Sequence, residues 1–205
     1  KTTTLVALLD LTPRATRFIA LSSQQETFAF RSTATPETDY LIPHELSDHT
    51  PQYIWGDEVR FLFKLIRDEG YAFGTTMHAS NPTDVLNQLS LPPVTTPIEN
   101  LLATDLILML KEEPLELGLH EVTLVHPNAN QWDLISLATW NYETRRFQFA
   151  PNDVLLPAIA TKIGQPSGYV AEDWSQRATF LDHLVNRGVY DPYRVRQAIL
   201  TYEPQ

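Results

Sequence analysis

The first residues of the chain combine an amine with a row of hydroxyls. Lys1 is followed by Thr2, Thr3 and Thr4, and then by the apolar residues 5–9. Where such a lysine ends a glycine-rich loop, its ammonium reaches the β- and γ-phosphates of a nucleotide, and the next hydroxyl binds Mg²⁺. A Lys-Thr pair also occurs without this role, so its meaning depends on the groups found later in the chain.

Two more candidate groups come after short apolar segments. Residues 53–55 are a candidate strand, and Glu58 comes shortly after it, where a carboxylate can hold a metal-bound water or polarise an attacking water. His78 ends a second candidate strand, residues 71–77, and ligands of open α/β sheets bind at the edge where strands end. In the plainer interpretation, Asp57 and Glu58 cap a helix and His78 is an ordinary surface or core histidine.

A third candidate is a zinc site. The segment from His44 through Glu45 to His49 is superficially similar to the zinc motif H-E-x-x-H. In that motif the histidines share one helix face, whereas His44 and His49 are five positions apart, which would turn them ~140° from each other on a helix. A solvated loop is the simpler interpretation.

The elements that must position these groups alternate between strands and helices in the first half of the chain. This order predicts a largely parallel α/β sheet, with the continuous apolar run 106–110 as a central strand. Residues 31–50 are polar, contain prolines and show no clear period. The other predicted elements are helices at 4–10, 58–67 and from Thr83, a strand at 17–21, antiparallel strands at 121–125, 134–140 and 147–150, and helices at 157–163, 170–185 and 192–202.

The bulk composition excludes several classes of protein. With 43% hydrophobic and 20% charged residues, the chain has the composition of a folded globular protein rather than a disordered one. It contains no cysteine, which excludes disulfides and cysteine-ligated metals. Its formal net charge of −10 argues against sequence-independent binding of nucleic acid and gives no polybasic route to anionic lipids.

In their order along the chain, these groups resemble the ATPases of type II and type IV secretion, type IV pilus, archaellum and conjugation machines. Residues 1–5, K-T-T-T-L, are similar to the end of that family's nucleotide loop, and residues 58–60, E-V-R, to the end of its Walker B strand. Residues 70–79, G-Y-A-F-G-T-T-M-H-A, match its His box. Residues 140–147 look like a hairpin of the archaeal branch, and residues 178–202 look like that branch's C-terminal helices.

The resemblance implies an α/β fold. The expected architecture is a RecA-like P-loop NTPase core, incomplete at its N-terminus, followed by a small antiparallel β unit and C-terminal helices. Because Lys1 falls inside the nucleotide loop of the family pattern, we expect the chain to be the C-terminal portion of such an ATPase. The implied domains are residues 1–115, the core, and residues 116–205, the hairpin unit with the helical subdomain.

The resemblance also implies a function. The expected activity is that of a hexameric motor that hydrolyses ATP with Mg²⁺ to power secretion, pilus or archaellum assembly. Its partners would be further copies of the chain and a polytopic membrane platform protein, which would hold it at the cytoplasmic face of the cell membrane; nucleic acid is not an expected partner. The implied roles are phosphate binding for Lys1, Thr2 and Thr3, metal binding for Thr2 and Glu58, and catalysis for Glu58, Glu26, His78 and Arg60.

Some positions depart from the family pattern in ways that bear on hydrolysis. Ser22 and Ser23 stand where the family's Asp box has two acids, and a serine cannot act as a carboxylate base near neutral pH. Asp57 replaces the glycine before the Walker B acid, and Gln88 replaces an arginine. Losing arginines that stabilise phosphoryl charge lowers turnover by factors of about 10³–10⁵. The alternative function is therefore a degenerate subunit that binds nucleotide, or only packs into the machine, with little or no hydrolysis.

Overall fold

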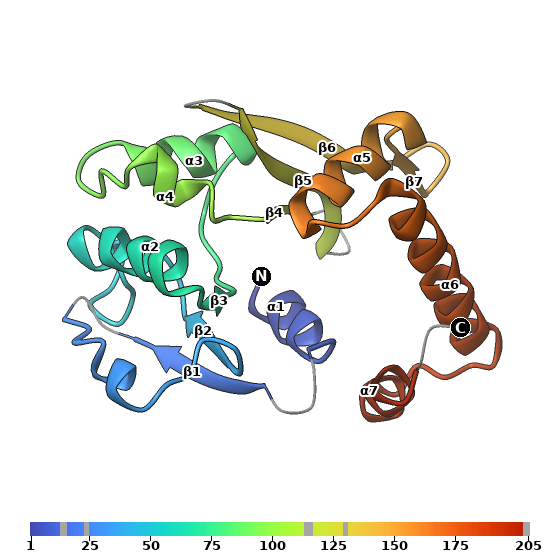
Figure 1. Ribbon diagram of the computed structural model, residues 1–205, viewed down its shortest axis with the longest axis horizontal. Helices are drawn as coiled ribbons and strands as arrows, with labels where there is room; N and C mark the ends of the chain where they lie inside the picture. Colours follow the sequence, from blue (N-terminus) through green and yellow to red (C-terminus); the bar gives the residue numbers. More distant parts are fainter. Residues whose placement is uncertain (13–15, 23–24, 113–116, 129–130, 203–205) are drawn as a thin grey trace. The chain divides into compact units, whose positions relative to one another are not determined.

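The chain is a mixed α/β protein with one parallel and one antiparallel sheet (Figure 1). The residues that the computed structural model describes are 1–12, 16–22, 25–112, 117–128 and 131–202. They belong to two compact units, each described by itself below: Lys1–Thr2 with Ala15–Gln148, and Thr3–Arg14 with Phe149–Gln205.

Short strands and helices alternate up to α4, and the long antiparallel strands and the last helices come after it. The bounds are α1 Thr2–Leu9, β1 Arg17–Leu21, η1 Ala29–Ser32, β2 Asp39–Pro43, α2 Asp57–Glu69, β3 Ala72–Phe73, α3 Pro82–Ser90, α4 Ile98–Leu101, β4 Leu106–Glu112, β5 Leu117–Asn128, β6 Gln131–Asn141, β7 Arg146–Phe149, α5 Asn152–Ile163, α6 Ser167–Asn186 and α7 Pro192–Leu200.

The parallel sheet has the strand order β1-β2-β3, and its first two strands are tied together where they begin. Arg17 and Asp39 are partners in register. Arg17 Nε donates to Asp39 Oδ1 over 2.8 Å, Arg17 Nη2 donates to Oδ2, and the Thr35 N–H donates to Oδ2 over 2.7 Å. The hydrogen bond from Arg17 is the main cause that lowers the pKa of Asp39 to about 2, while the pKa of Arg17 is raised. The buried carboxylate is therefore charged and fully paired.

Helix α2 supplies one face of the core of this unit. Its buried residues include Val59, Leu62, Phe63 and Ile66, which recur at helical spacing. They belong to the same cluster as Leu41 of the central strand β2, which is completely buried. The predicted helix at 58–67 is confirmed, and its apolar stripe holds it to the sheet.

The prediction of the parallel sheet itself is partly wrong. Residues 53–55 form no strand, and Ile54 makes only an isolated parallel bridge to Leu46. Of the strand expected at residues 71–77, only Ala72–Phe73 forms. The backbone in these places pairs at one residue or over two, so a short apolar run was not sufficient to make a full strand.

Two strands differ from expectation for a physical reason. The central strand β2 lies in the segment that showed no clear period, because its first buried residue, Asp39, is polar and hides the alternation of buried side chains. The apolar run 106–110 lies in β4, an edge strand of the antiparallel sheet rather than a central parallel strand. Its partner β5 begins after only a few residues, and a parallel partner would need a crossover of about a dozen residues or more.

The antiparallel sheet confirms the three strands predicted after residue 120. Its order is β4-β5-β6-β7. Asn141 starts the turn between β6 and β7, and its Oδ1 accepts the N–H groups of Glu143 and Thr144 over 3.0 and 2.9 Å. The rings of Trp140 and Phe147 pack edge to face across this hairpin, with centroids 5.1 Å apart.

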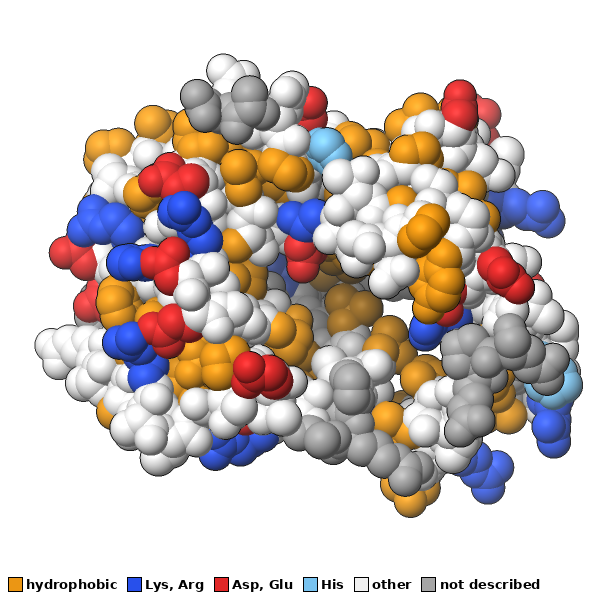
Figure 2. Space-filling model, in the orientation of Figure 1, with side chains coloured by type: hydrophobic (Ala, Val, Ile, Leu, Met, Phe, Trp, Pro, Cys, Tyr) orange, Lys and Arg blue, Asp and Glu red, His pale blue; other side chains and the backbone are white. Residues whose placement is uncertain are grey.

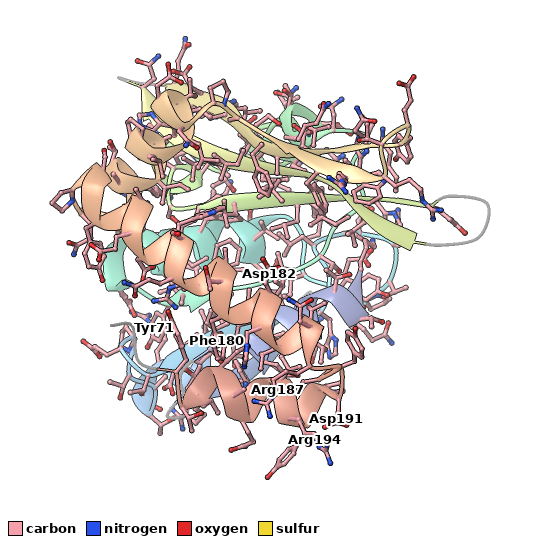
Figure 3. All side chains as sticks on the ribbon, turned by 90° about the vertical axis from the view of Figure 1, so that its right-hand side faces the viewer. Tyr71, Phe180, Asp182, Arg187, Asp191 and Arg194 are labelled. Atoms are coloured by element: carbon pink, nitrogen blue, oxygen red, sulfur yellow. The ribbon has the colours of Figure 1, made fainter. Side chains whose placement is uncertain are left out.

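The second unit is helical, as predicted for the end of the chain. Helix α5 begins at Asn152, five residues before the predicted start at Pro157, and ends at Gly164 with a φ of 67°. Asp191 caps α7, where its Oδ1 accepts the Arg194 N–H over 2.9 Å (Figure 3). The rings of Phe180 and Tyr202 stack with centroids 4.4 Å apart.

The distribution of charged side chains on the surface is relevant to the partners that the sequence predicts. On the face that Figure 2 shows, Lys and Arg side chains lie among Asp and Glu side chains rather than in one basic patch. None of the helices in the described part of the chain is long and apolar enough to cross a membrane.

The expected domain boundary near residue 115 stays a prediction, because the compact units describe packing and not separate functions.

We expect the Arg17–Asp39 pair to make the stability of the protein sensitive to acid. The folded protein lowers the pKa of Asp39 to about 2, whereas an aspartate in the unfolded chain has a pKa of about 4. The stabilisation from the pair is therefore complete above about pH 4, and it is lost as the pH falls from about 4 to about 2. Asp39→Asn should lower the free energy of unfolding at pH 7 and flatten the acid limb, measured by urea titration at each pH.

The control is Glu37→Gln, which changes an exposed carboxylate two positions away. It should leave both the stability at pH 7 and the acid limb as in the wild type. An acid limb of wild-type steepness in Asp39→Asn would show that other carboxylates govern the acid response.

Candidate functional site

The parallel pairing of the first sheet continues past its strands at Leu46. The Leu46 N–H donates to the Thr76 carbonyl over 2.9 Å, and Leu46 forms isolated parallel bridges with both Ile54 and Met77. The Ile54 N–H donates to the Glu45 carbonyl over 3.2 Å. Three segments of the chain therefore meet just beyond the carboxyl end of the central strand, where parallel sheets bind their ligands.

Glu45 stands at this junction and contacts two of the predicted site residues. Its Oε2 lies 3.3 Å from Lys1 Nζ, and its Oε1 lies 3.7 Å from His78 Nε2. The Glu45 side chain is only 12% exposed, whereas that of Lys1 is 28% exposed and that of His78 is 67% exposed. The fold thus brings the amine at one end of the motif series and the imidazole at the other end to a single, largely buried carboxylate.

A small cavity of about 90 Å³ opens beside His78. The imidazole rings of His49 and His78 lie side by side there, tilted by 48° with centroids 5.9 Å apart, and Trp55 also lines the space. Gln88 Nε2 donates to the His78 carbonyl over 3.1 Å. Gln88, which stands where the family pattern has an arginine, therefore supports the backbone at His78. Ligand pockets usually measure about 300–1,000 Å³. This cavity therefore has room for a phosphate group or ordered water, not for a whole nucleotide.

The two threonines before His78 fix the segment that carries it. Thr75 Oγ1 donates to the Pro43 carbonyl over 3.1 Å, and Thr76 Oγ1 donates to the His44 carbonyl over 3.2 Å. Both acceptors belong to the end of β2 and the residues after it. A hydroxyl at each of these positions therefore aligns His78 with Glu45, which gives the Thr-Thr pair of the motif a structural reason.

Glu58 lies in the first turn of α2 rather than at the end of a strand. Before it, Gly56 takes a φ of 67° and a ψ of −129°, which glycine adopts readily, and turns the chain into the helix. The Glu58 carboxylate is half-buried and makes no hydrogen bond or ion pair with any residue that the structure describes. The expected strand before it is absent from that part of the chain, so its local place is that of an acidic helix start.

Arg60 points to a different neighbourhood. Its Nη2 forms an ion pair with Asp57 Oδ1, and its Nη1 donates to Thr95 Oγ1 over 2.6 Å. These contacts tie α2 to the segment between α3 and α4. They do not include Glu45 or His78, so the direct role of Arg60 in the site stays a prediction.

The remaining predicted residues are spread more widely. Glu26 Oε1 accepts the Phe28 N–H over 2.9 Å and so stabilises a local turn. Thr2 and Thr3 are exposed residues in the first turn of α1. Of the two serines in the Asp-box position, Ser22 is exposed just after β1, and Ser23 lies outside the described residues.

The structure gives the zinc alternative no support. Residues 44–49 are not helical, and the His49 ring lies beside that of His78. Within the described ranges, no group of three or more His, Asp or Glu side chains is arranged to hold a metal ion. Because zinc usually takes at least three protein ligands, this segment is better interpreted as part of the Glu45 junction.

A larger hollow, of about 360 Å³, belongs to the helical unit and does not suit an anion. It lies between α5 and α6, and Leu155, Trp174 and Asp182 are among the residues that line it. Its lining contains no Lys, Arg or His. The smaller cavity is lined by two imidazoles, His49 and His78, together with Asp48, and the Lys1 ammonium lies next to it through Glu45.

Sequence reasoning missed Glu45 and His49 as neighbours of the predicted residues. Recognising β2 would have placed Glu45 two residues beyond a central strand, because Leu41 and Pro43 alternate with less buried neighbours. The polar Asp39 at the start of the strand obscured that alternation. No signal in the sequence indicates that His49 lies beside His78, since this depends on how the connecting loop folds.

Comparisons with known proteins add no assignment. No protein-family model matches the chain, and no curated protein sequence matches it. The functional inference therefore rests on the motifs and on the geometry of the Glu45 junction.

The helix after the His box offers a test of how this segment is held. Asn81 Oδ1 accepts the Asp84 N–H over 2.9 Å, and the Ser80 N–H and hydroxyl donate to Asp84 Oδ2, which lowers the pKa of Asp84. Asn81→Ala removes the cap of α3 and should lower the free energy of unfolding by about 1 kcal/mol, measured by urea titration.

Asn87→Ala is the matched control, because it deletes the same amide from an exposed position inside the same helix. Alanine favours helix over asparagine, so the control should be neutral or slightly stabilising. Equal losses in the two variants would argue against capping as the cause.

Proposed function

We propose that the chain binds the phosphates of a nucleotide at the Glu45 junction and acts as a P-loop ATPase. One observation carries the proposal: Lys1 and His78, which stand at the two ends of the motif series, both contact Glu45. The contact lies just beyond the carboxyl end of the central strand, where open α/β sheets bind their ligands.

The residues fit a phosphate group. A half-buried ammonium and an exposed imidazole are the donors that a phosphate oxygen accepts from. The adjoining cavity is large enough for one phosphate and too small for a base with its ribose.

The residues also fit Mg²⁺ in a limited way. Mg²⁺ usually binds through one or two protein oxygens, several waters and the phosphates themselves, so a protein-only cluster is not required. The candidates are the Thr2 hydroxyl, next in sequence to Lys1, and the Glu58 carboxylate, which has no other partner in the described part of the chain. The ion would neutralise phosphate charge when bound.

Each predicted site residue would have a role that follows from the chemistry of its side chain. The Lys1 ammonium would neutralise charge on the β- and γ-phosphates, and His78 would donate a hydrogen bond to a terminal phosphate oxygen. Glu58 would accept a hydrogen bond from water near that phosphate. Arg60 and Glu26 would act through the positions of α2 and of the turn after β1, in keeping with their contacts.

The proposal includes the setting that the family resemblance implies. The core would be RecA-like, and the chain would work with ATP and Mg²⁺ in a hexamer of its own kind. It would act on a polytopic membrane platform protein at the cytoplasmic face of the membrane, in a secretion, pilus or archaellum machine. The net charge of −10 supports a protein partner over nucleic acid.

A specific observation favours the alternative, a degenerate subunit that binds nucleotide without turning it over. Arg60 is engaged with Asp57, the residue that replaces the family's glycine. Ser22, just after β1, offers a hydroxyl where the family has a carboxylate. Both departures remove charge that would act on the phosphoryl group.

We expect Lys1→Ala to weaken the binding of a fluorescent ATP analogue in the presence of Mg²⁺ by about tenfold or more, since it removes a charge-assisted bond. His78→Ala should weaken it about fivefold. Lys64→Ala is the control, because it removes the same charge from an exposed ion pair with Asp68. Equal effects of Lys1→Ala and Lys64→Ala, or a wild-type protein that binds no ATP at millimolar concentration, would refute the site.

Phosphate release then separates the motor from the degenerate subunit. If the chain hydrolyses ATP, Glu58→Gln should reduce turnover about a hundredfold, while Glu99→Gln, an exposed acid in the first turn of α4, should leave it unchanged. Wild-type protein that binds ATP but releases no phosphate would establish the alternative. Replacing Ser22 and Ser23 with acids should then create turnover if the Asp box is the cause.

A further inference from the structure

The Glu45 carboxylate lies where the phosphate of the proposed ligand would bind, so two negative groups would occupy the same site. Its two carboxylate oxygens face different side chains, with Oε2 3.3 Å from the Lys1 ammonium Nζ and Oε1 3.7 Å from the His78 imidazole Nε2. A phosphate group needs the same two side chains. Glu45 and phosphate therefore compete for Lys1 and His78.

The backbone of Glu45 is held firmly, so the carboxylate cannot leave by a shift of its segment. Its carbonyl accepts the Ile54 N–H over 3.2 Å, and the next residue, Leu46, donates to Thr76 and is buried in the core. The preceding residue, His44, accepts from Thr76 Oγ1 over 3.2 Å. When an anion arrives, Glu45 and Lys1 can therefore separate only by rotation of their side chains.

The low exposure of Glu45 adds to the strength of this competition. A carboxylate that is 12% exposed is less screened by water than a surface one, so it attracts a nearby ammonium and repels a nearby phosphate more strongly. Both effects act against anion binding. Both disappear when the carboxylate is replaced by the amide of the same shape.

We propose that Glu45 is an internal counter-anion that holds Lys1 and faces His78 in the ligand-free protein, and that a nucleotide must displace it from both. This inference rests on the proposed nucleotide site. It gives Glu45 a role opposite to that of a metal-binding carboxylate, because its negative charge weakens nucleotide binding. The residue thereby sets a threshold for the nucleotide concentration at which the site fills.

The test is the affinity of Glu45→Gln for the fluorescent ATP analogue, measured with Mg²⁺ and again with EDTA. The dissociation constant should fall about fivefold in both conditions. Glu69→Gln is the matched control, because it removes one negative charge from another glutamate in an ion pair, with Arg31. Its affinity should equal that of the wild type, which excludes an effect of net charge alone.

A double variant links the effect to the lysine. In the Lys1→Ala background, Glu45→Gln should improve binding less than it does in the wild type, because one of the two contacts that it releases is already gone. Thermal unfolding of each variant, followed by circular dichroism, confirms that all four proteins are folded at the temperature of the assay.

The outcomes separate this inference from the proposed function. Wild-type protein that binds ATP, with a Glu45→Gln variant of equal or lower affinity, overturns the counter-anion and leaves the nucleotide site intact. Weaker binding of the variant with Mg²⁺ alone would make Glu45 a metal-side carboxylate instead. Binding by the variant but not by the wild type supports the counter-anion strongly, and no binding by either overturns both proposals.

Discussion

The backbone pairing of Leu46 is the constraint on which the candidate site depends. This one residue pairs with both Ile54 and Met77, and its side chain is buried in the core of the first unit. Successive residues of an extended chain point to opposite sides, so burying Leu46 directs Glu45 away from the core. The hydrophobic effect that holds Leu46 therefore also aims the carboxylate at Lys1 and His78.

The surrounding hydrogen bonds show how a sheet with little regular pairing can still be specific. Only a few residues of β3 pair with β2, yet side-chain hydroxyls extend the alignment beyond the strands. At the other end of the sheet, the ion pair between Arg17 and Asp39 holds β1 and β2 in register. Polar groups thus fix the register at both ends, and the apolar stripe of α2 supplies the burial that stabilises the middle.

The arrangement also accounts for the tension between the two proposed functions. Lys1 and His78 both contact Glu45, while Arg60 is engaged with Asp57. Binding a phosphate needs positive charge near the ligand, but turning it over needs further charge and a placed base in the transition state. A site can keep the first property and lose the second, which is why binding and hydrolysis have to be measured separately.

The sequence by itself determined the elements that have a strong local pattern. The stripe of α2, the Asn141 turn, the antiparallel strands and the glycine at the end of α5 all result from short-range rules of spacing and turn geometry. The order of the motifs along the sequence also identified Lys1 and His78 as candidate site residues. The tertiary structure alone decided that β2 is the central strand, that residues 53–55 pair at a single position, and that Glu45 and His49 join the site. These features depend on pairing between segments far apart in the chain, and a local pattern carries no information about which distant partner satisfies a buried charge or a free backbone group.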